Sequence, residues 1–429
     1  MLTADLVANL LISRFYLTVL QDMGGTATFA LFLGLAAFSF LFIFAMAPET
    51  KGRPLEAIRV YWENGGRWPD APARAPRRGP RPGSSPRIAA DRCRLMTGTR
   101  MAAEMAEQPA RLASLVVRAG EVARLVGGRR FDGVTIVARG SPDHAATYGR
   151  YLLEAATGRP VSMAAPSLHT LYGIEADYRG QLVVAVSQSG RTPEIVRTLE
   201  ALSGAGGFGL AITNDEASEL AARAEAVVAL RLGEEEAVPA TKTVTGQMVA
   251  FVLLAGALGN LPFPSAALTA LPSAVDEVLA DGGCADDAVA ALDDAAQLIV
   301  VARGYLYGAA LETALKIKET CSLLADGYSS ADLRHGPIAA VTHGPPVIDL
   351  NADGPAHADV SELTSELRRR GAQVVTVGAG GDVSLPAEVP EALAPGLAVV
   401  RGQQLARALA LRLGYDPDRP EGLTKVTPT

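Results

Sequence analysis

The chain has 429 residues, of which 49% are hydrophobic; this is long and apolar enough for two or three domains with their own cores and excludes a wholly disordered polypeptide. Its charge is uneven: residues 1–100 carry 13 Lys/Arg and 7 Asp/Glu, a balance of +6, whereas the remaining residues carry 26 and 39, a balance of −13. The acidic majority of the chain argues against a nucleic-acid partner, because phosphate backbones are bound by clustered Lys and Arg.

The cysteines and histidines show no metal-binding pattern. Cys93, Cys284 and Cys321 form no CxxC pair, and none of the five histidines has HExxH spacing. We therefore predict no metal and no cofactor. The low cysteine content favours a reducing compartment, so we expect the larger, acidic part of the chain to be cytoplasmic.

The N-terminal region has the hydropathy of a membrane segment. Residues 27–47 are uncharged and apolar on every face, which is about the length of one bilayer crossing. Lys51 and Arg53 follow, and the positive-inside rule places that end in the cytoplasm. We expect membrane contact only through residues 1–50.

A short motif follows this apolar run, reading PETKGR at residues 48–53 and then Leu55-Glu56. It resembles the C-terminal end of a sugar-porter transporter of the major facilitator superfamily, over about residues 1–70. Two helices cannot form a transport path between repeats, so transport is not expected. Residues 71–100, rich in Pro, Arg and Ala, are expected to be a disordered linker. A genuine fusion and a gene-model artefact both remain open.

Beyond the linker, strand-like and helix-like segments alternate, which is typical of α/β proteins. Continuous apolar runs favour parallel strands covered on both faces. They lie at residues 134–138, 181–186, 208–213, 298–302, 347–350 and 373–377. The tetrapeptide Val-Ala-Arg-Gly occurs at 137–140 and again at 301–304. We therefore predict two similar α/β domains in tandem, 101–265 and 285–415, each a parallel sheet flanked by helices.

The segment with the clearest chemistry is SQSGRTPE at residues 187–194. It leaves a predicted strand and enters a helix, with Thr192 as N-cap and Pro193 in the first helical position. Such a turn offers hydroxyls, free N–H groups and the positive end of a helix dipole, which suit a phosphate. An ordinary capped βα loop is the alternative, and the residues alone do not separate the two.

This segment closely resembles the phosphate loop of SIS (sugar isomerase) domains. Five further segments resemble the isomerase half of glucosamine-6-phosphate synthase: residues 138–141, 237–242, 311–319, 332–337 and 416–425. The six segments keep the family's order over about 290 residues. The resemblance implies a double-SIS enzyme with a catalytic tail at residues 416–429.

The resemblance also implies roles for individual residues. Glu319 would be the base that moves a proton between C1 and C2 of the sugar. His335 would open the sugar ring, and Lys425 would contact the carbonyl, with or without a Schiff base. The substrate-binding residues would be Gly140, Ser141, Ser187, Gln188, Ser189, Thr192, Val238, Lys316 and Thr424. From the residues alone, an exposed stripe of ion pairs on one helix face is the favoured interpretation of Glu312, Lys316 and Glu319.

Three departures from the synthase pattern refine the expected activity. Arg191 stands where the synthase has an acidic residue, Ala240 where it has a serine, and Glu421 where it has an arginine. Nothing in residues 1–100 resembles the synthase's glutaminase. The chain is therefore more similar to SIS-type glucosamine-6-phosphate deaminases, which release ammonia and fructose 6-phosphate.

Alternatives remain open. They are an isomerase or deglycase for another amino-sugar or fructosamine phosphate, an aminotransferase-like isomerase, and a sugar-phosphate sensor without catalysis. The resemblance further implies a homodimer in which His335 completes the neighbouring subunit's site.

Overall fold

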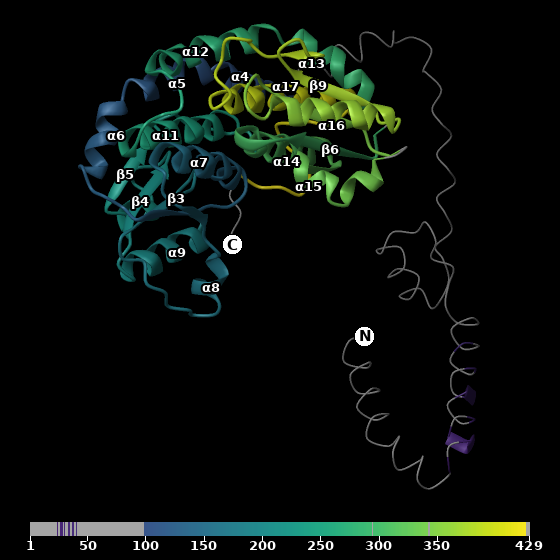
Figure 1. Cartoon of the computed structure of the whole chain (residues 1–429), viewed down its shortest axis with the longest axis horizontal. Helices are drawn as coiled ribbons and strands as arrows, with labels where there is room; N and C mark the ends of the chain where they lie inside the picture. Colours follow the sequence, from purple (N-terminus) through teal and green to yellow (C-terminus); the bar gives the residue numbers. More distant parts are fainter. Residues whose placement is uncertain are drawn as a thin grey trace. The chain divides into compact units, whose positions relative to one another are not determined.

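The computed structural model describes residues 98–425, apart from 294, 342 and 343, together with scattered residues between 24 and 40 (Figure 1). Residues 87–429 form one compact unit, separate from residues 1–86. The predicted membrane helix at 27–47 lies largely outside the described residues, as does nearly all of the predicted linker at 71–100. Within the part of the chain that is described, no helix is both long and apolar enough to cross a membrane.

The N-terminal half of the compact unit is built on a five-stranded parallel sheet in the order β2-β1-β3-β4-β5. The strands are β1 (Gly133–Val137), β2 (Val161–Met163), β3 (Gln181–Val186), β4 (Phe208–Thr213) and β5 (Ala226–Ala229). Nearly every residue of β1, β3 and β4 is buried, which is why their sequences are continuously apolar. The predictions for 134–138, 181–186 and 208–213 are confirmed to within one residue.

The C-terminal half repeats this sheet, in the order β10-β9-β8-β6-β7. Its strands are β6 (Gln297–Ala302), β7 (Leu324–Ser329), β8 (Val347–Leu350), β9 (Val374–Gly378) and β10 (Val383–Ser384). All pairings are parallel. The first strand of each half lies between the second and the third, so both sheets have the same topology. The predicted fold class, two tandem parallel-sheet α/β domains, is confirmed.

Helices cover both faces of each sheet (Figure 1). In the first half they are α4 (Thr99–Ala106), α5 (Gln108–Val116), α6 (Ala119–Val126), α7 (Ser141–Thr157), α8 (Pro166–Thr170), α9 (Pro193–Gly204), α10 (Glu219–Arg223) and α11 (Lys242–Leu258). In the second they are α13 (Gly283–Ala288), α14 (Tyr307–Cys321), α15 (Ser330–Arg334), α16 (His357–Arg369) and α17 (Ala394–Leu413), with short 3₁₀ turns η1 (Val289–Leu292), η2 (Gly304–Leu306) and η3 (Pro337–Ala340). Helix α12 (Ser265–Ala280) occupies most of the stretch between the predicted domain limits of 265 and 285.

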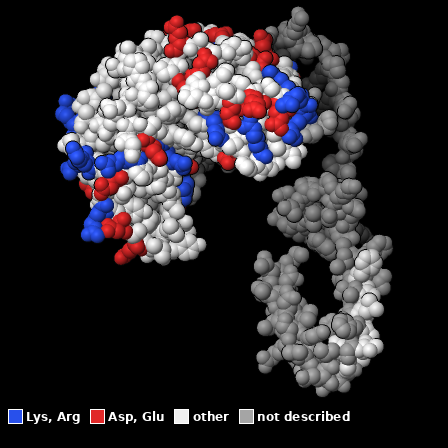
Figure 2. Space-filling view, viewed as in Figure 1, with Lys and Arg blue, Asp and Glu red and all other residues white. Residues whose placement is uncertain are grey.

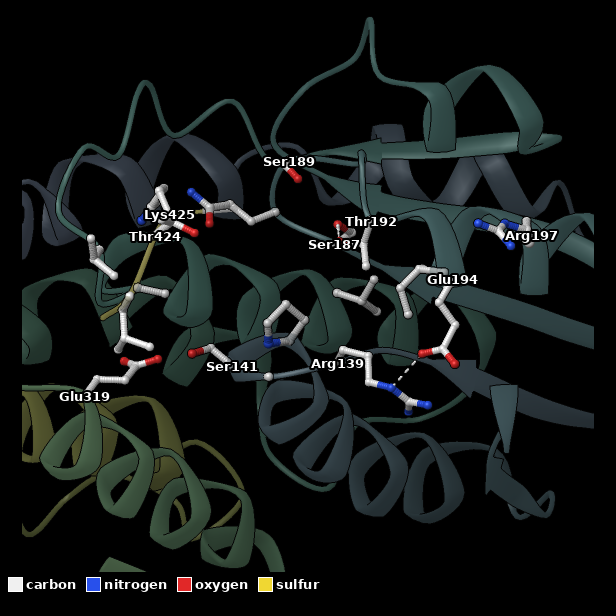
Figure 3. A pocket seen from close by; sticks show the side chains of 18 of the residues that line it. Arg139, Ser141, Ser187, Ser189, Thr192, Glu194, Arg197, Glu319, Thr424 and Lys425 are labelled. Atoms are coloured by element: carbon white, nitrogen blue, oxygen red, sulfur yellow. Dashed lines mark hydrogen bonds and ion pairs between the residues drawn. The ribbon is translucent and has the colours of Figure 1, made fainter. Parts of the chain in front are cut away.

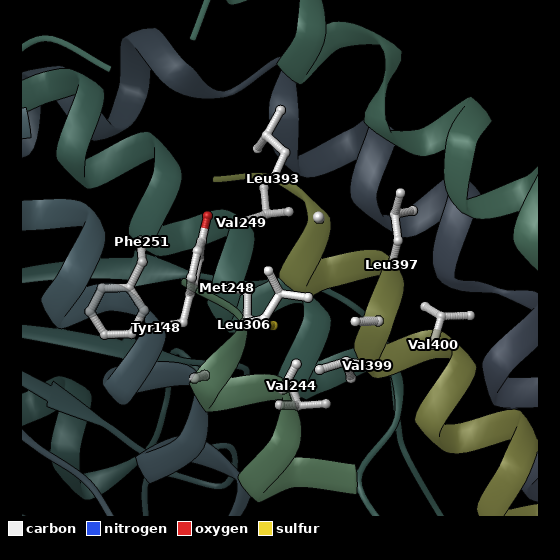
Figure 4. Close-up of a cluster of buried hydrophobic side chains, with 14 of the residues drawn as sticks. Tyr148, Val244, Met248, Val249, Phe251, Leu306, Leu393, Leu397, Val399 and Val400 are labelled. Atoms are coloured by element: carbon white, nitrogen blue, oxygen red, sulfur yellow. The ribbon is translucent and has the colours of Figure 1, made fainter. Parts of the chain in front are cut away.

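The two halves share one hydrophobic core. Helix α14 packs against both α17 and α7, and α7 packs against α11. The helix that follows the first strand of each half, α7 or α14, therefore contacts the other half. Tyr148, Phe251, Leu306 and Leu397 are buried together in this core (Figure 4), and the Tyr148 hydroxyl donates a hydrogen bond to the Ala392 carbonyl at 2.7 Å. Burial of a large aromatic side chain stabilises the fold by about 1.5–3 kcal/mol, so this shared core holds the sheets in a fixed relation.

The C-terminal tail is tied to the start of the unit. The Asp418 carboxylate accepts hydrogen bonds from the backbone N–H groups of Met101 (2.8 Å) and Arg100 (3.0 Å), and Asp416 accepts one from Gly98 (3.2 Å). The first N–H groups of a helix have no intrahelical acceptor, so carboxylates from the distant tail serve as the cap of α4. This anchor places the last described residues, 423–425, against the first half.

Charges of both signs mix on the surface. In the view of Figure 2, acidic and basic side chains lie beside one another rather than in a single basic face. Exposed pairs such as Arg370–Glu366 (2.6 Å) and Arg111–Glu107 (2.9 Å) are of the i,i+4 kind. Such pairs contribute at most about 1 kcal/mol each.

Candidate active site at the edge of the first sheet

A cavity of about 660 Å³ opens at the carboxyl edge of the first sheet, where the strand order reverses between β1 and β3. Ligands of open α/β sheets bind at this kind of position. The residues that line it come from six segments: Arg139, Gly140, Ser141 and Pro142; Thr170 and Leu171; Val186, Ser187, Gln188, Ser189, Thr192, Glu194, Ile195 and Arg197; Val238 and Ala240; Glu319; and Leu423, Thr424 and Lys425. The structure therefore brings together every predicted site residue except Lys316 and His335.

The hydroxyl turn after β3 forms one wall (Figure 3). Thr192 is the N-cap of α9 in an extended conformation, but its side chain makes no capping hydrogen bond; its hydroxyl lies 3.4 Å from that of Ser187. Gly190 has φ +61°, and a Cβ there would lie 2.1 Å from the Ser218 hydroxyl, so the turn requires glycine. The first N–H groups of a twelve-residue helix and its dipole thus face the cavity beside three hydroxyls, which suits an anion.

Glu319 lies across the cavity from this turn (Figure 3), on α14 of the second half. Its carboxylate is 2.5 Å from the Lys316 ammonium, which also donates to the Ser141 hydroxyl at 3.2 Å. Helix α14 reaches the first half because Gly308 lets it approach α7: a Cβ at that glycine would lie 2.5 Å from the His144 carbonyl. A carboxylate from one half therefore faces the hydroxyl turn of the other across the cavity.

Lys316 is completely buried between two carboxylates, 3.3 Å from Glu312 and 2.5 Å from Glu319. Burial alone would lower the pKa of this lysine, but the two carboxylates outweigh it and raise the pKa above its usual value. Glu312 is also buried, and Lys316 and His144 (Nδ1 to carboxylate, 2.8 Å) together hold its pKa below the usual range against the effect of burial. The alternative of an exposed ion-pair stripe is wrong for Glu312 and Lys316, because the domains pack over that helix face.

Lys425 occupies the end of the cavity formed by the tail. Its ammonium donates to the Glu235 carboxylate at 2.8 Å and to the Ala237 carbonyl at 2.6 Å. Glu235 is buried, and burial alone would raise its pKa. The charge of Lys425 and hydrogen bonds from Lys425, Thr241 and Thr243 outweigh that effect, so the pKa of Glu235 is lowered. In this state Lys425 is an ion-paired ammonium.

His335 lies outside this cavity in its own chain. It is exposed at the end of α15, and its backbone N–H bonds to the Ala331 and Asp332 carbonyls. The roles predicted for Glu319, His335 and Lys425 stay predictions, since geometry alone does not test catalysis.

Sequence reasoning missed several residues at this site. The half-buried His144 is the partner of Glu312, the buried Glu235 is the partner of Lys425, and Arg139 pairs with Glu194 at the cavity wall (2.9 Å). Glu235 lies in the acidic run 234–236, which reads as solvent-exposed in sequence. Its proximity to the 237–242 motif was the available signal.

The sequence model of the SIS domain matches residues 132–257 and 291–389, more than half of the chain. The model for "Sugar (and other) transporter" matches residues 2–62, in agreement with the resemblance of that region.

Curated relatives include glutamine–fructose-6-phosphate aminotransferases (isomerizing). The protein of Methanothermobacter thermautotrophicus is 30% identical over 336 residues, which cover 76% of this chain and 56% of the relative. That of Symbiobacterium thermophilum is 35% identical over 321 residues, covering 68% and 51%. The chain therefore spans about half the length of the curated relatives it matches.

Among solved structures, a proposed phosphosugar isomerase from Silicibacter pomeroyi is 32% identical, with a TM-score of 0.66 and coverage of 75% of this chain and 100% of that one. A glucosamine-6-phosphate deaminase from Thermotoga maritima shares the fold, with a TM-score of 0.62, 23% identity and coverage of 74% and 100%. Because the family model matches both halves and covers more than half of the residues, this chain belongs to the SIS domain family.

Proposed function

We propose that the cavity binds an amino-sugar phosphate and that the chain converts glucosamine 6-phosphate to fructose 6-phosphate and ammonia. One observation supports the proposal: the hydroxyl turn at the start of α9 and the Glu319 carboxylate face each other across the same 660 Å³ cavity. A phosphosugar isomerase needs this pair, because the phosphate fixes the substrate while the base moves a proton at the other end.

In this proposal the phosphate binds the hydroxyls of Ser187, Ser189 and Thr192 and the first N–H groups of α9. The positive end of the helix dipole favours the dianion. Gln188, Val238 and Thr424 line the same cavity, and Gly140 and Ser141 form its floor beside Glu319.

Glu319 would remove the proton from C2 of the open-chain sugar and return it to C1. The C2 amine gives up a proton as O1 gains one, so that C2 becomes an imine and C1 a hydroxymethyl group; water then adds to C2, and ammonia leaves to give the ketone. Lys316, held by Glu312 and Ser141, fixes the orientation of the Glu319 carboxylate. Lys425 would approach the carbonyl when it leaves Glu235.

Ring opening requires a group that can give and take a proton. His335, the residue predicted for this role, does not line the cavity of its own chain. We propose a homodimer in which His335 of one subunit reaches the site of the other. The exposure of His335 on α15 supports this arrangement, since it leaves the imidazole available to a second chain.

A second candidate is an aminotransferase-like isomerase working in the opposite direction. The 30–35% identity to glutamine–fructose-6-phosphate aminotransferases favours it. In that case ammonia would come from glutamine hydrolysis, and fructose 6-phosphate would be the substrate.

A nitrogen-balance assay separates the two candidates. The full chain is incubated with glucosamine 6-phosphate alone, and ammonia and fructose 6-phosphate are measured together. We expect equal amounts of both, unchanged by added glutamine. Glucosamine without phosphate is the matched control and should yield far less ammonia, because it lacks the anchor. Conversion of fructose 6-phosphate only when glutamine is supplied would instead favour the aminotransferase-like isomerase.

A further inference from the structure

The two halves of the unit correspond at a constant distance in sequence. Arg139 and Arg303 lie 164 residues apart, and the same offset relates Ser187 to Asn351, each the first residue after its strand. It also relates Pro193 to His357, the first residues of α9 and α16. The edge of the second sheet between β6 and β8 is therefore the counterpart of the candidate active site.

A second cavity, of about 680 Å³, opens at this counterpart edge. Its lining again combines both halves: Arg150, Tyr151, Glu154 and Ala155 from α7; Arg303, Gly304 and Tyr305 after β6; Pro355, Ala356 and Asp359 after β8; and Glu391 before α17. Strand-order reversal is a ligand-binding position in both sheets. The similar volume shows that the repeat has kept the cavity open.

The chemistry of the second cavity excludes a close copy of the first site. The offset carries Ser187, Ser189 and Thr192 to Asn351, Asp353 and Ala356, so the three phosphate-facing hydroxyls are replaced by an amide, a carboxylate and a methyl group. The same offset relates Glu319, which lines the first cavity, to Ala155, which lines the second. The cavity therefore lacks both the anion-binding turn and the base.

Glu391 is the unusual residue of this cavity. It is only 9% exposed, yet it lines the open volume. The Ala356 N–H donates to its carboxylate, and no Lys, Arg or His forms an ion pair with it among the described residues. Burial raises its pKa despite that hydrogen bond. A carboxylate buried without a cation is costly unless a ligand supplies one.

Other side chains around the cavity can contact the rest of a ligand. The Arg303 guanidinium donates to the Ser329 hydroxyl at 3.3 Å, which leaves further donors, and Arg150 lies 5.7 Å from the Tyr151 ring centre. The rings of Tyr151 and Tyr305 are 6.4 Å apart and tilted by 60°, forming an aromatic wall. Of the three acidic residues in the lining, Asp359 is already paired with Arg334 at 2.8 Å, and Glu154 is exposed and accepts a hydrogen bond from the Val161 N–H at 3.3 Å. Glu391 is the buried carboxylate among them, and for that reason the one most in need of a ligand cation.

We propose that this second cavity is a non-catalytic binding site for a small primary ammonium compound without phosphate. The ammonium would meet Glu391, and hydroxyl or carboxylate oxygens of the same molecule would meet Arg303. An amino sugar and an α-amino acid both have this chemistry. The site stands apart from the proposed reaction, because its residues are distinct from those of the first cavity.

Equilibrium binding to the full chain tests the proposal, with glucosamine, L-glutamine and glucose as probes. We expect one of the two amines to bind, while glucose, which has the ring without the ammonium, does not. Glu391→Gln should weaken amine binding by at least about tenfold, the effect of losing a charge-assisted hydrogen bond. Ser189→Ala, in the first cavity, should leave this binding unchanged. If neither glucosamine nor L-glutamine binds, the proposal is overturned.

Two further variants test whether a loss of binding comes from the cavity itself. Glu388→Gln, an exposed residue three positions away, is the matched control and should bind as wild type does. Arg303→Met removes the second contact and should also weaken binding, which keeps the test decisive should Glu391→Gln fold poorly. Amine binding that survives both substitutions, or that disappears with Ser189→Ala, would show that the second cavity is not the site.

Discussion

The carboxyl edges of the two sheets differ more in chemistry than in shape. Both lie where the strand order reverses, both hold a cavity of similar volume, and both receive residues from the helix that follows the other half's first strand. The turn after β3 presents hydroxyls to its cavity, whereas the turn after β8 carries Asn351, Asp353 and Ala356 at the equivalent positions. Topology therefore provides the cavity, and a few loop and helix side chains decide what it can bind.

The helix across each cavity shows the same contrast. In the first cavity α14 presents Glu319 next to the buried Lys316, while α7 presents Ala155 at the equivalent place in the second. A methyl group cannot accept a proton. If the proposed reaction is correct, catalysis belongs to the first cavity alone.

The largest expected effect comes from removing the proposed base. Glu319→Gln should lower turnover by about a hundred- to ten-thousand-fold, because the amide keeps the shape of the side chain but accepts no proton. Substrate binding, measured directly, should change little. Glu362→Gln, an exposed glutamate on α16, is the matched control and should leave turnover unchanged. Near-normal turnover of Glu319→Gln would remove Glu319 from the mechanism.

Subunit exchange tests whether the first site is completed by a partner. His335→Ala and Glu319→Gln should each be inactive alone. In a two-fold dimer, random pairing makes half of the dimers mixed, and each mixed dimer has one site with both groups intact. Activity after exchange should recover to about a quarter of wild type. A mixture that stays inactive after verified exchange would place both residues of each site on the same chain.

A smaller effect should distinguish the two turns. Ser189→Ala removes a proposed phosphate contact that exists throughout the reaction, so KM should rise by about tenfold while kcat stays within a few-fold. Asp353→Ala, at the equivalent position after β8, should change neither constant. Equal effects of the two substitutions would argue against a phosphate turn unique to the first half.

The last expected effect is on stability rather than on activity, and it concerns a difference between the two sheets. β8 carries Asp349 where β3 has Ala185, and burial raises the pKa of Asp349 to about 7, although the Thr364 hydroxyl bonds to it. Between about pH 4 and 7 the folded chain then holds a proton that the unfolded chain has lost, so this carboxyl group's contribution to stability falls as the pH rises.

Asp349→Asn should abolish that loss. The free energy of unfolding of the variant, relative to wild type, should increase between pH 4 and pH 7 by roughly 1–4 kcal/mol, at about 1.4 kcal/mol per pKa unit. Denaturant unfolding at several pH values measures it. Parallel stability curves for the two proteins would contradict a protonated Asp349.

The amino-acid sequence by itself determined the repeated architecture. Continuous apolar runs located β3, β4 and β8 at their observed bounds, because strands buried on both faces leave no room for polar residues. The segment 187–194 also predicted its own geometry, since Thr192 and Pro193 set the start of α9 locally.

Only the tertiary structure decided which distant residues meet. The pairing of His144 with Glu312, of Glu235 with Lys425, and the capping of α4 by Asp418 join positions more than 160 residues apart. Charged residues on a helix read as solvent-exposed in sequence, because burial of Glu312 and Lys316 depends on packing by the other domain. No local pattern encodes that packing, since it arises when two apolar helix faces, each predictable alone, cover one another.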